Sequence, residues 1–223
     1  MRVDSNSQKL AGVNSSKLAL LKQEWADCKS CVLSKNRSKI LWGVGNPAAE
    51  VMLLVDRHAP SDLLGRILES DSSQHKVLTA LLSYHNASLE DFWTTCVVLC
   101  PEIGYSEDMP DTLPAASISC VTSCRPRLAQ EISIIGPEVI VAFGTATFKA
   151  LFQKNAPSLQ HDSGRMTEAL IQGVHTQYAV PVMLTHPLST LYANQDFSPS
   201  GLWAEVSEHI SIAIRIARKL RTP

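Results

Sequence analysis

Three short apolar runs place the strongest limit on how this chain can fold. Val51–Val55, Thr94–Leu99 and Glu138–Phe143 are five or six residues long, mostly apolar and rich in β-branched side chains. Continuous runs of this kind are typical of strands buried on both faces, as in a parallel sheet with helices on either side. A fourth run, Tyr178–Leu184, has the same character, although Pro181 makes its place in the sheet less regular.

Helical periodicity fills the segments between these runs, apart from a proline-rich loop predicted over Pro101–Ala116. Strands that alternate with helices predict an α/β fold with a parallel sheet that helices cover on both faces. In such folds ligands bind beyond the carboxyl ends of the strands. The residues that follow those ends are Asp56, Cys96–Cys100, Gly144 and His186. The predicted helices are Ser16–Asp27, His75–His85, Leu128–Ile135, the segment from Gly144 to Leu151, and Trp203–Leu220.

The composition bounds the domain count and the kind of partner. A chain of 223 residues with 45% hydrophobic content can bury one sizeable core, which predicts a single domain over residues 15–223 behind a flexible polar leader at 1–14. The 20 basic and 21 acidic residues nearly balance, whereas a protein that coats nucleic acid through bulk charge is more basic. Contacts with DNA, single-stranded or duplex, would therefore be local and made by a groove.

Six cysteines stand at positions 28, 31, 96, 100, 120 and 124. The N-terminus lacks the basic and apolar regions of a signal peptide, and no apolar run reaches the roughly 18 residues that a membrane span needs. These features predict a cytoplasmic protein with no membrane contact. In that compartment disulfides are rare, so clustered cysteines more often indicate a metal centre.

Four segments of the chain follow one another in an order that carries a resemblance. They are the CxxC pair at Cys28 and Cys31, then LWGVGNPAAEVMLLVD, CRPRLAQEISIIGPEVIVAFGTAT and VMLTHPLSTL. Together, over residues 28–192, they resemble the iron–sulfur (thermophile-type, family 4) uracil-DNA glycosylases. The resemblance implies a three-layer α/β/α sandwich on a four-stranded parallel sheet, a [4Fe–4S] cluster, and removal of a base from uracil-containing DNA. We expect the protein to be a monomer.

The resemblance also implies which cysteines hold the cluster. Thiolates suit iron–sulfur clusters and zinc about equally, although a zinc ribbon usually needs two close cysteine pairs. Cys120 is offset by four residues from the family's position and is interpreted as a near neighbour, and the insert at 101–123 is longer than usual for the family. Scattered buried cysteines are the alternative. The implied ligands are Cys28, Cys31, Cys100 and Cys124.

Two residues take the family's catalytic positions. Counted without a gap from Gly45, the family's catalytic carboxylate falls on Asp56, which would orient water and stabilise positive charge on the sugar. Counted from Ala59 and Pro60 instead, the position falls on His58, and an Asp that caps a strand-end turn is a further alternative for Asp56. His186 matches the histidine that donates to the uracil O2 as charge grows on the leaving base.

The positions that would bind the base and the DNA depart from the family. Leu68 stands where a phenylalanine stacks on the flipped base, and Cys96 stands where an asparagine reads the uracil edge. A thiol is a weak donor and a weak acceptor, so the preference for uracil is in doubt. Arg165, in the place of a basic turn near DNA, is a candidate phosphate contact. Leu191 is a candidate wedge into the base stack, although an ordinary core contact would look the same.

Two functional hypotheses follow from this pattern. The first is a base-excision glycosylase of weak or altered specificity, which hydrolyses the N-glycosidic bond of uracil or another damaged base. The second is a catalytically silent descendant of the same fold that binds DNA or a replication or repair protein. Retention of Asp56 and His186 favours the first hypothesis. The changes at Leu68 and Cys96 favour the second.

Overall fold

The structure is a computed structural model that describes residues 5–35, 37, 39–56, 70, 72–100, 115–153, 156–173, 177–193 and 201–221. Its strands are β1 (Val44–Gly45), β2 (Val51–Val55), β3 (Trp93–Cys96), β4 (Val139–Phe143), β5 (Met166–Gln172) and β6 (Gln177–Thr185). Its α-helices are α1 (Ser5–Trp25), α2 (Ser73–Ser83), α3 (Ala115–Ile135), α4 (Thr145–Phe152), α5 (Leu159–Asp162), α6 (Leu188–Ala193) and α7 (Leu202–Arg221). Two 3₁₀ turns, η1 (Val32–Lys35) and η3 (Leu89–Asp91), complete the described elements.

The six strands form one sheet in the order β1-β3-β2-β4-β6-β5. The four central strands run parallel to one another, which confirms the predicted parallel sheet. The two outer strands, β1 and β5, pair antiparallel and extend the sheet beyond the four strands that the apolar runs predict. Because all four parallel strands end at the same edge, the residues that follow them lie close together in space.

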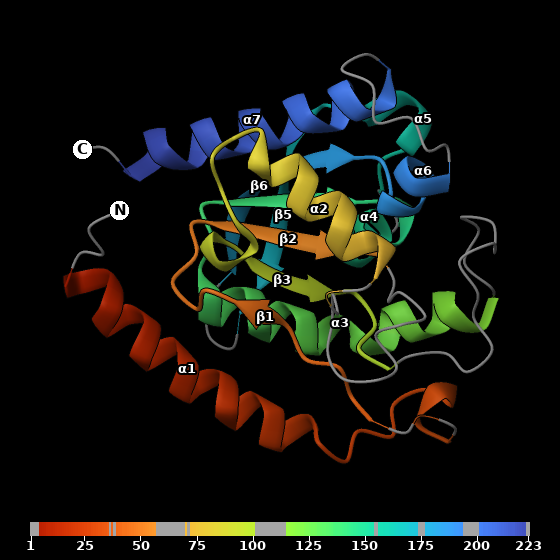
Figure 1. The fold of residues 1–223 in the computed structure, drawn as a ribbon. Coiled ribbons are helices and arrows are strands. Elements are labelled where there is room, and N and C mark those ends of the chain that lie inside the picture. Colours follow the sequence, from red (N-terminus) through yellow and green to blue (C-terminus); the bar gives the residue numbers. More distant parts are fainter. Residues whose placement is uncertain are drawn as a thin grey trace.

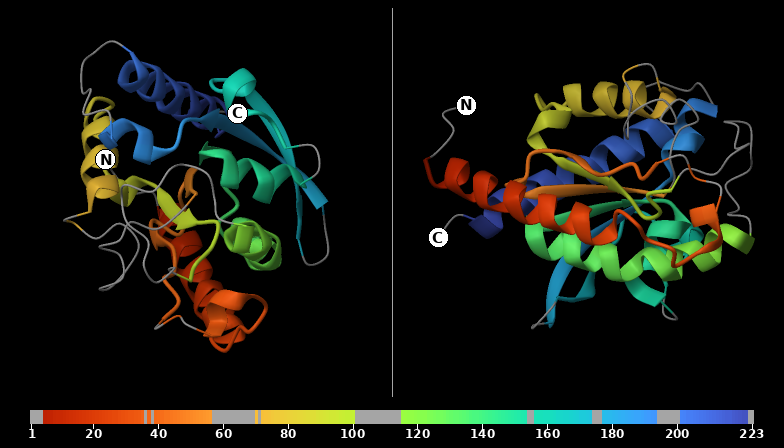
Figure 2. Two further views of the ribbon diagram at one scale, coloured as in Figure 1. Left: turned by 90° about the vertical axis from the view of Figure 1, so that its right-hand side faces the viewer. Right: turned by 90° about the horizontal axis from the view of Figure 1, so that it is seen from below.

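Helices cover both faces of this sheet. Figure 1 shows α2 and α7 on one face, and Figure 2 shows the sheet between that layer and a second layer that contains α1, α3 and α4. The apolar side chains separate into two cores along the same division. Within β2, Met52 and Leu54 join the core beneath α3, whereas Leu53 joins the core beneath α7. This two-sided burial explains why the strand is a continuous apolar run instead of an alternating one.

Two helices begin earlier than the periodicity predicts. Helix α1 begins at Ser5, so residues 5–14, predicted as a flexible leader, form its first turns. Within this segment the Asn14 side chain is buried and donates from Nδ2 to the Pro47 carbonyl at 2.7 Å. Helix α3 begins at Ala115 and continues through Pro126, although a proline inside a helix removes one backbone hydrogen bond. Packing against α1 and the sheet outweighs that local preference.

Strand β6 carries Pro181 without losing a bond to β4. The pairing of β4 with β6 starts at Val182, so Pro181 lies before the stretch that is paired on that side. Strand β5, absent from the predicted elements, pairs with β6 along its whole length and forms the outer edge of the sheet. Among the described helices, none has both the length and the apolar character that crossing a membrane requires.

Candidate active site and cysteine centre

The first residues after β2, β4 and β6 form a compact group at one edge of the sheet. Asp56, which follows β2, is only 6% exposed. Gly144 follows β4 with φ 85°, and a side chain there would place its Cβ 2.6 Å from the Asp56 Oδ2 and 3.0 Å from the Pro187 Cβ. Glycine is therefore needed at this position both for its backbone angle and for the close approach of the Asp56 carboxylate. The predicted catalytic residue Asp56 thus lies against the segment that begins with His186.

His186 lies partly open to solvent and is held by a carboxylate from α7. Its side chain is 22% exposed, and its Nε2 lies 3.1 Å from the Oε1 of Glu205, whose side chain is 45% exposed. Glu205 stands in the first turn of α7, next to Val206, which is fully buried beneath the helix. The carboxylate is thus anchored by a packed helix while it contacts the predicted leaving-group donor.

A second histidine lies behind the first. His209 is buried, and its Nδ1 lies 2.8 Å from the Thr185 Oγ1, at the end of β6. Burial lowers the pKa of His209 below its ordinary value, an effect that the Glu205 carboxylate opposes. Gly164, with φ 78°, packs so closely that a Cβ there would lie 2.6 Å from the His209 Nε2. His209 therefore joins α7 to β6 and to the turn before β5.

The turn before β5 presents the predicted DNA contact to solvent. Arg165 is 71% exposed, and its Nη1 lies 3.0 Å from the Asp162 Oδ1. An exposed pair of this kind contributes little to stability, so the guanidinium can exchange its partner for a phosphate. Leu191, the predicted wedge, is instead buried on α6 within the core beneath α7, which matches the alternative of an ordinary core contact. Leu68 and His58 lie outside the described residues.

Cys96, the predicted base reader, stands at the end of β3 beside the catalytic edge. The register pairs it with Val55, the residue before Asp56, and the Val97 N–H donates to the Val55 carbonyl at 3.1 Å. Its side chain is fully buried in the core beneath α2 and α7. Cys96 thus faces the opposite side of the sheet from Cys120, which belongs to the core beneath α3.

A buried ion pair from α3 holds the end of β3. Arg127 and Glu131 bond to each other one helical turn apart, and both are almost fully buried. Arg127 Nη2 also donates to the carbonyls of Cys96 and Val97, each at 2.9 Å. Glu131 accepts from the Trp93 indole Nε1 at 2.9 Å and from the Thr95 hydroxyl at 3.1 Å. This network ties the cysteine-bearing helix to the strand that carries Cys96.

Five of the six cysteines gather at the same end of the molecule. They come from the segment after α1, from the residues after β3 and from α3. The Cys31 and Cys120 thiols hydrogen-bond to each other, and Cys124 interacts electrostatically with Cys100 and Cys31. We refer to this group as the cysteine centre. Its members are Cys28, Cys31, Cys100, Cys120 and Cys124.

The guanidinium of Arg37 lies against two thiols of the cysteine centre. The Arg37 Nη1 donates to the Cys100 Sγ at 3.4 Å, and the same guanidinium interacts with Cys28. Burial raises the pKa of Cys100 and raises that of Cys124 to about 11. Burial and the neighbouring Cys31 thiol raise the pKa of Cys120 to about 12. Burial also acts to raise the pKa of Cys28, but the hydrogen bonds of Ser30 and the charge of Arg37 lower it overall.

The residue types of the cysteine centre suit an iron–sulfur cluster, because cysteine thiolates are the ligands that such clusters use. Thiolates carry the negative charge of such a cluster, and hydrogen bonds to their sulfurs stabilise it. In the part of the chain that the structure describes, no three histidine, cysteine or acidic side chains stand close enough together to hold a metal ion. The chemistry of the residues therefore supports the cluster more strongly than their spacing does.

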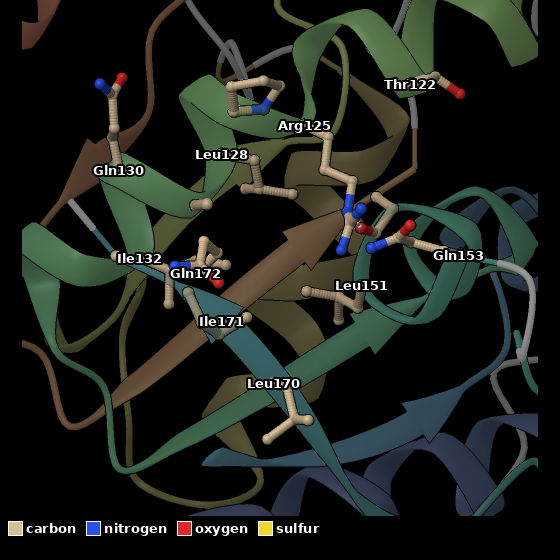
Figure 3. A pocket seen from close by; sticks show the side chains of 14 residues that line it. Thr122, Arg125, Leu128, Gln130, Ile132, Leu151, Gln153, Leu170, Ile171 and Gln172 are labelled. Carbon is tan, nitrogen blue, oxygen red and sulfur yellow. Dashed lines mark hydrogen bonds between the residues drawn. The ribbon is translucent and has the colours of Figure 1, made fainter. Parts of the chain in front are cut away.

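A separate cavity of about 590 Å³ lies beside the outer strand β5 (Figure 3). Residues of α3, of the end of α4 and of β5 line it, and most of these side chains are apolar. Among the described residues that line it, Arg125 alone is charged, and its Nε donates to the Ala150 carbonyl at 2.7 Å. None of Asp56, Gly144 and His186 lines this cavity, so it is distinct from the candidate active site.

Comparison with known proteins identifies the family of the chain. The model of the uracil DNA glycosylase superfamily matches residues 42–205, which include β1 to β6 and the first turn of α7. The chain belongs to the uracil DNA glycosylase superfamily. It is 24% identical over 177 residues to a type-4 uracil-DNA glycosylase of Sulfurisphaera tokodaii, covering 78% of this chain and 76% of the relative. Against the type-4 enzyme of Pyrobaculum aerophilum it is 28% identical over 169 residues, or 74% of this chain and 80% of the relative.

The superfamily assignment confirms the resemblance drawn from the four sequence segments, and it accounts for the fold. Sequence reasoning did not identify four of the residues that build the site. Two pairs share an (i, i+4) spacing on a helix, Arg127 with Glu131 and Glu205 with His209. That spacing was the available signal, because it places both members of a pair on one helical face.

Proposed function

We propose that this protein is a monofunctional DNA glycosylase of altered base preference, which hydrolyses the N-glycosidic bond of uracil or another damaged base in DNA. The observation that supports it is the meeting of Asp56 with the His186–Pro187 segment across Gly144, at the carboxyl ends of three parallel strands. A carboxylate and an imidazole so placed can act on the two sides of one bond. The type-4 uracil-DNA glycosylases among its relatives belong to the same superfamily.

In the proposed reaction the flipped base lies between these two groups. As the bond between the sugar carbon and the base nitrogen breaks, its electron pair leaves with the base and positive charge develops on the sugar. The Asp56 carboxylate stabilises that charge and orients a water molecule, whose oxygen bonds to the sugar carbon. The water's proton is lost to solvent, and His186 donates a hydrogen bond to the base oxygen on which negative charge grows.

The pocket for the base is the reason to propose an altered preference. Cys96 offers one weak donor and weak acceptor at the position where an asparagine would supply both. Its thiol is also fully buried beneath α2 and α7. A site that lacks a paired donor and acceptor loses discrimination by hydrogen bonding and selects mainly by shape. We propose Leu68 as the apolar contact to the base.

We propose that Cys28, Cys31, Cys100 and Cys124 hold a [4Fe–4S] cluster, with Cys120 as a neighbour. When bound, the cluster would supply covalent links between the segment after α1, the end of β3 and helix α3. Arg37 would donate to the Cys100 sulfur, as it does in the structure. The Arg127–Glu131 pair would transmit the position of α3 to the end of β3, where Cys96 stands.

We propose local contacts with DNA, in which the exposed Arg165 binds a phosphate beside the active site. The direct test is release of free base by purified protein from uracil-containing single-stranded and duplex DNA, with the same DNA without uracil as control. Release that depends on Asp56 supports the proposal. DNA binding with no release of any base contradicts it.

The second candidate is a catalytically silent protein that binds DNA or a repair protein through the same surface. The buried thiol at Cys96 favours it, because the residue cannot read a base edge as an amide does. Cys96→Asn, alone and with Leu68→Phe, separates the two candidates. If either variant gains uracil release over wild type, the site is catalytic with a weakened reader. If neither variant releases base while the protein stays folded, the result supports the catalytically silent binding protein.

A further inference from the structure

His186 belongs to a contact network that joins β6 to α7 and consists of Thr185, His186, Glu205 and His209. Its Nε2 lies 3.1 Å from the Glu205 Oε1, and the His209 Nε2 lies 3.9 Å from the same oxygen. The His209 Nδ1 in turn lies 2.8 Å from the hydroxyl of Thr185, the residue that precedes His186. Each side chain of the contact network is therefore held by its neighbours. The network includes His186, the predicted donor to the leaving base.

Buried residues and a close backbone segment pack around this contact network. Glu205 and His209 stand four residues apart on one face of α7, and Val206 and Ile210, which follow each of them, are fully buried beneath that helix. The Gly164 backbone closes over the His209 ring, where a Cβ would come within 2.6 Å of Nε2. Of the four residues in the contact network, only Glu205 and His186 have side chains substantially open to solvent.

The chemistry of the contact decides which nitrogen of His186 carries a proton. A neutral imidazole has one donor and one acceptor nitrogen, and the partner of one nitrogen sets the state of the other. An ionised carboxylate accepts hydrogen bonds only, so the nitrogen that faces it must donate. The Glu205 Oε1 faces the Nε2 of His186, and this contact excludes the neutral form with its proton on Nδ1 alone.

We infer that Glu205 is a positioning residue for His186, which keeps the imidazole proton on Nε2 and the ring turned toward the site before a base enters. In the free protein the half-exposed Glu205 carboxylate accepts the hydrogen bond from Nε2. When a base binds, its oxygen can replace the carboxylate as the acceptor. Its role is to prepare the donor and not to touch the base. This inference rests on the proposed function for its catalytic consequence, whereas its structural part concerns the free protein.

Three variants of α7 isolate the effect. Glu205→Ala removes the acceptor, whereas Glu205→Gln removes the charge and keeps an oxygen that can accept from Nε2. Glu208→Ala is the matched control, because Glu208 stands on the same helix and pairs with the exposed Arg215 at 3.1 Å. All three substitutions change a solvent-exposed acid, so the fold is expected to survive each of them.

The first measurement is ¹⁵N NMR of the imidazole nitrogens in the folded protein without DNA, with His186→Gln used to assign the signals. We expect a single form protonated on Nε2 in wild type, Glu205→Gln and Glu208→Ala, and a mixture of the two neutral forms in Glu205→Ala. An unchanged His186 signal in Glu205→Ala overturns the inference. This readout does not depend on catalysis, so it stands even if wild type releases no base and the proposed function fails.

The second measurement is base release. Glu205→Ala is expected to lower kcat by about tenfold, the lower end of the scale for removing a group that orients a functional histidine, with KM little changed. Glu205→Gln is expected to recover most of that loss, and Glu208→Ala to behave as wild type. Equal losses in Glu205→Gln and Glu205→Ala, or a gain of activity in Glu205→Ala, contradict positioning through the hydrogen bond.

Discussion

The active-site edge and the cysteine centre occupy the same end of the sheet but are built in different ways. Asp56, Gly144 and His186 each follow a strand directly, and the backbone bond from the Gly144 N–H to the Thr185 carbonyl, 3.0 Å long, joins two of those strand ends. The cysteines come from three separate segments and meet mainly through side chains. The sheet therefore fixes the first region, while the second depends on contacts between side chains of separate segments.

Because the two regions are built differently, substitutions in them are expected to affect different properties of the protein. At Asp56 and His186 a changed side chain is expected to alter chemistry more than backbone position, because the sheet holds both strand ends. In the cysteine centre a changed thiol is expected to loosen a whole segment, if the proposed cluster joins the segments. The Arg127–Glu131 pair lies between the two regions and bonds to residues of both the helix and the strand. Substitutions in the three places are expected to differ in size and in kind.

The largest effect is expected from the cysteine centre. Anaerobically purified protein should be brown and hold about four irons per chain. Changing Cys28, Cys31, Cys100 or Cys124 to alanine should remove the iron and lower the melting temperature, because three chain segments lose their common anchor. Iron content and visible absorbance measure the result.

Cys96→Ala and Cys120→Ala are the matched controls and should keep the cluster. Loss of iron in Cys120→Ala with retention in Cys124→Ala would exchange these two residues as the fourth ligand. Colourless protein that holds one zinc would contradict the cluster itself.

The next effect is expected at the buried pair. Arg127→Met leaves the Glu131 carboxylate buried without its cation, which should lower the free energy of unfolding by about 3–5 kcal/mol. Arg127→Met combined with Glu131→Met removes both charges and should cost clearly less than the single change. Denaturant unfolding measures both. If the double variant is as unstable as the single one, the network contributes through its bonds to β3 and not through charge balance.

A smaller effect concerns His209 and the pH dependence of stability. Burial holds its pKa below the ordinary value near 6.5 despite the opposing charges of Glu205 and Glu208. The unfolded chain therefore takes up this proton at a higher pH than the folded chain does. The contribution of neutral His209 to the free energy of unfolding is fully present above about pH 6.5. It is lost as the pH falls through the pKa of His209 in the folded protein.

His209→Gln should flatten that fall, as measured by denaturant unfolding between about pH 5 and pH 8. His161→Gln, a change at an exposed histidine of α5, is the control and should leave the fall intact. An unchanged profile in His209→Gln would assign the acid sensitivity to other groups.

The smallest effect is expected at the surface. Arg165→Ala should reduce the slope of log affinity for DNA against log salt concentration by about one unit, as the loss of one phosphate contact does. Arg215→Ala, which removes an exposed arginine paired with Glu208, is the matched control. Equal slopes for wild type and Arg165→Ala would remove Arg165 from the DNA-binding surface.

The same contrast explains how far the sequence alone could be interpreted. The four central strands and the positions of Asp56 and His186 were predictable, because doubly buried strands are continuous apolar runs and functional residues follow their ends. The start of α3 was not, since Pro126 and the prolines before it favour a loop locally. Strand β5 was missed because only Ala169 and Ile171 within it are buried, which gives a weak alternating pattern.

The second layer of the site was not predictable for a different reason. Glu205 and His209 belong to a long amphipathic helix, where acidic and polar residues ordinarily face solvent. Their contacts with His186 and Thr185 depend on how α7 crosses the end of β6, which is a tertiary property. The resemblance to type-4 enzymes gave the position of His186 but not the residues that hold it.

Single-turnover base release shows whether the strand ends form a working active site. Wild type and Asp56→Asn should be compared on uracil-containing single-stranded DNA at saturating protein, with DNA affinity and melting temperature measured on the same samples. We expect release by wild type, and release by Asp56→Asn that is lower by orders of magnitude at equal affinity and stability. Equal release by the two proteins, or none by either, would contradict it.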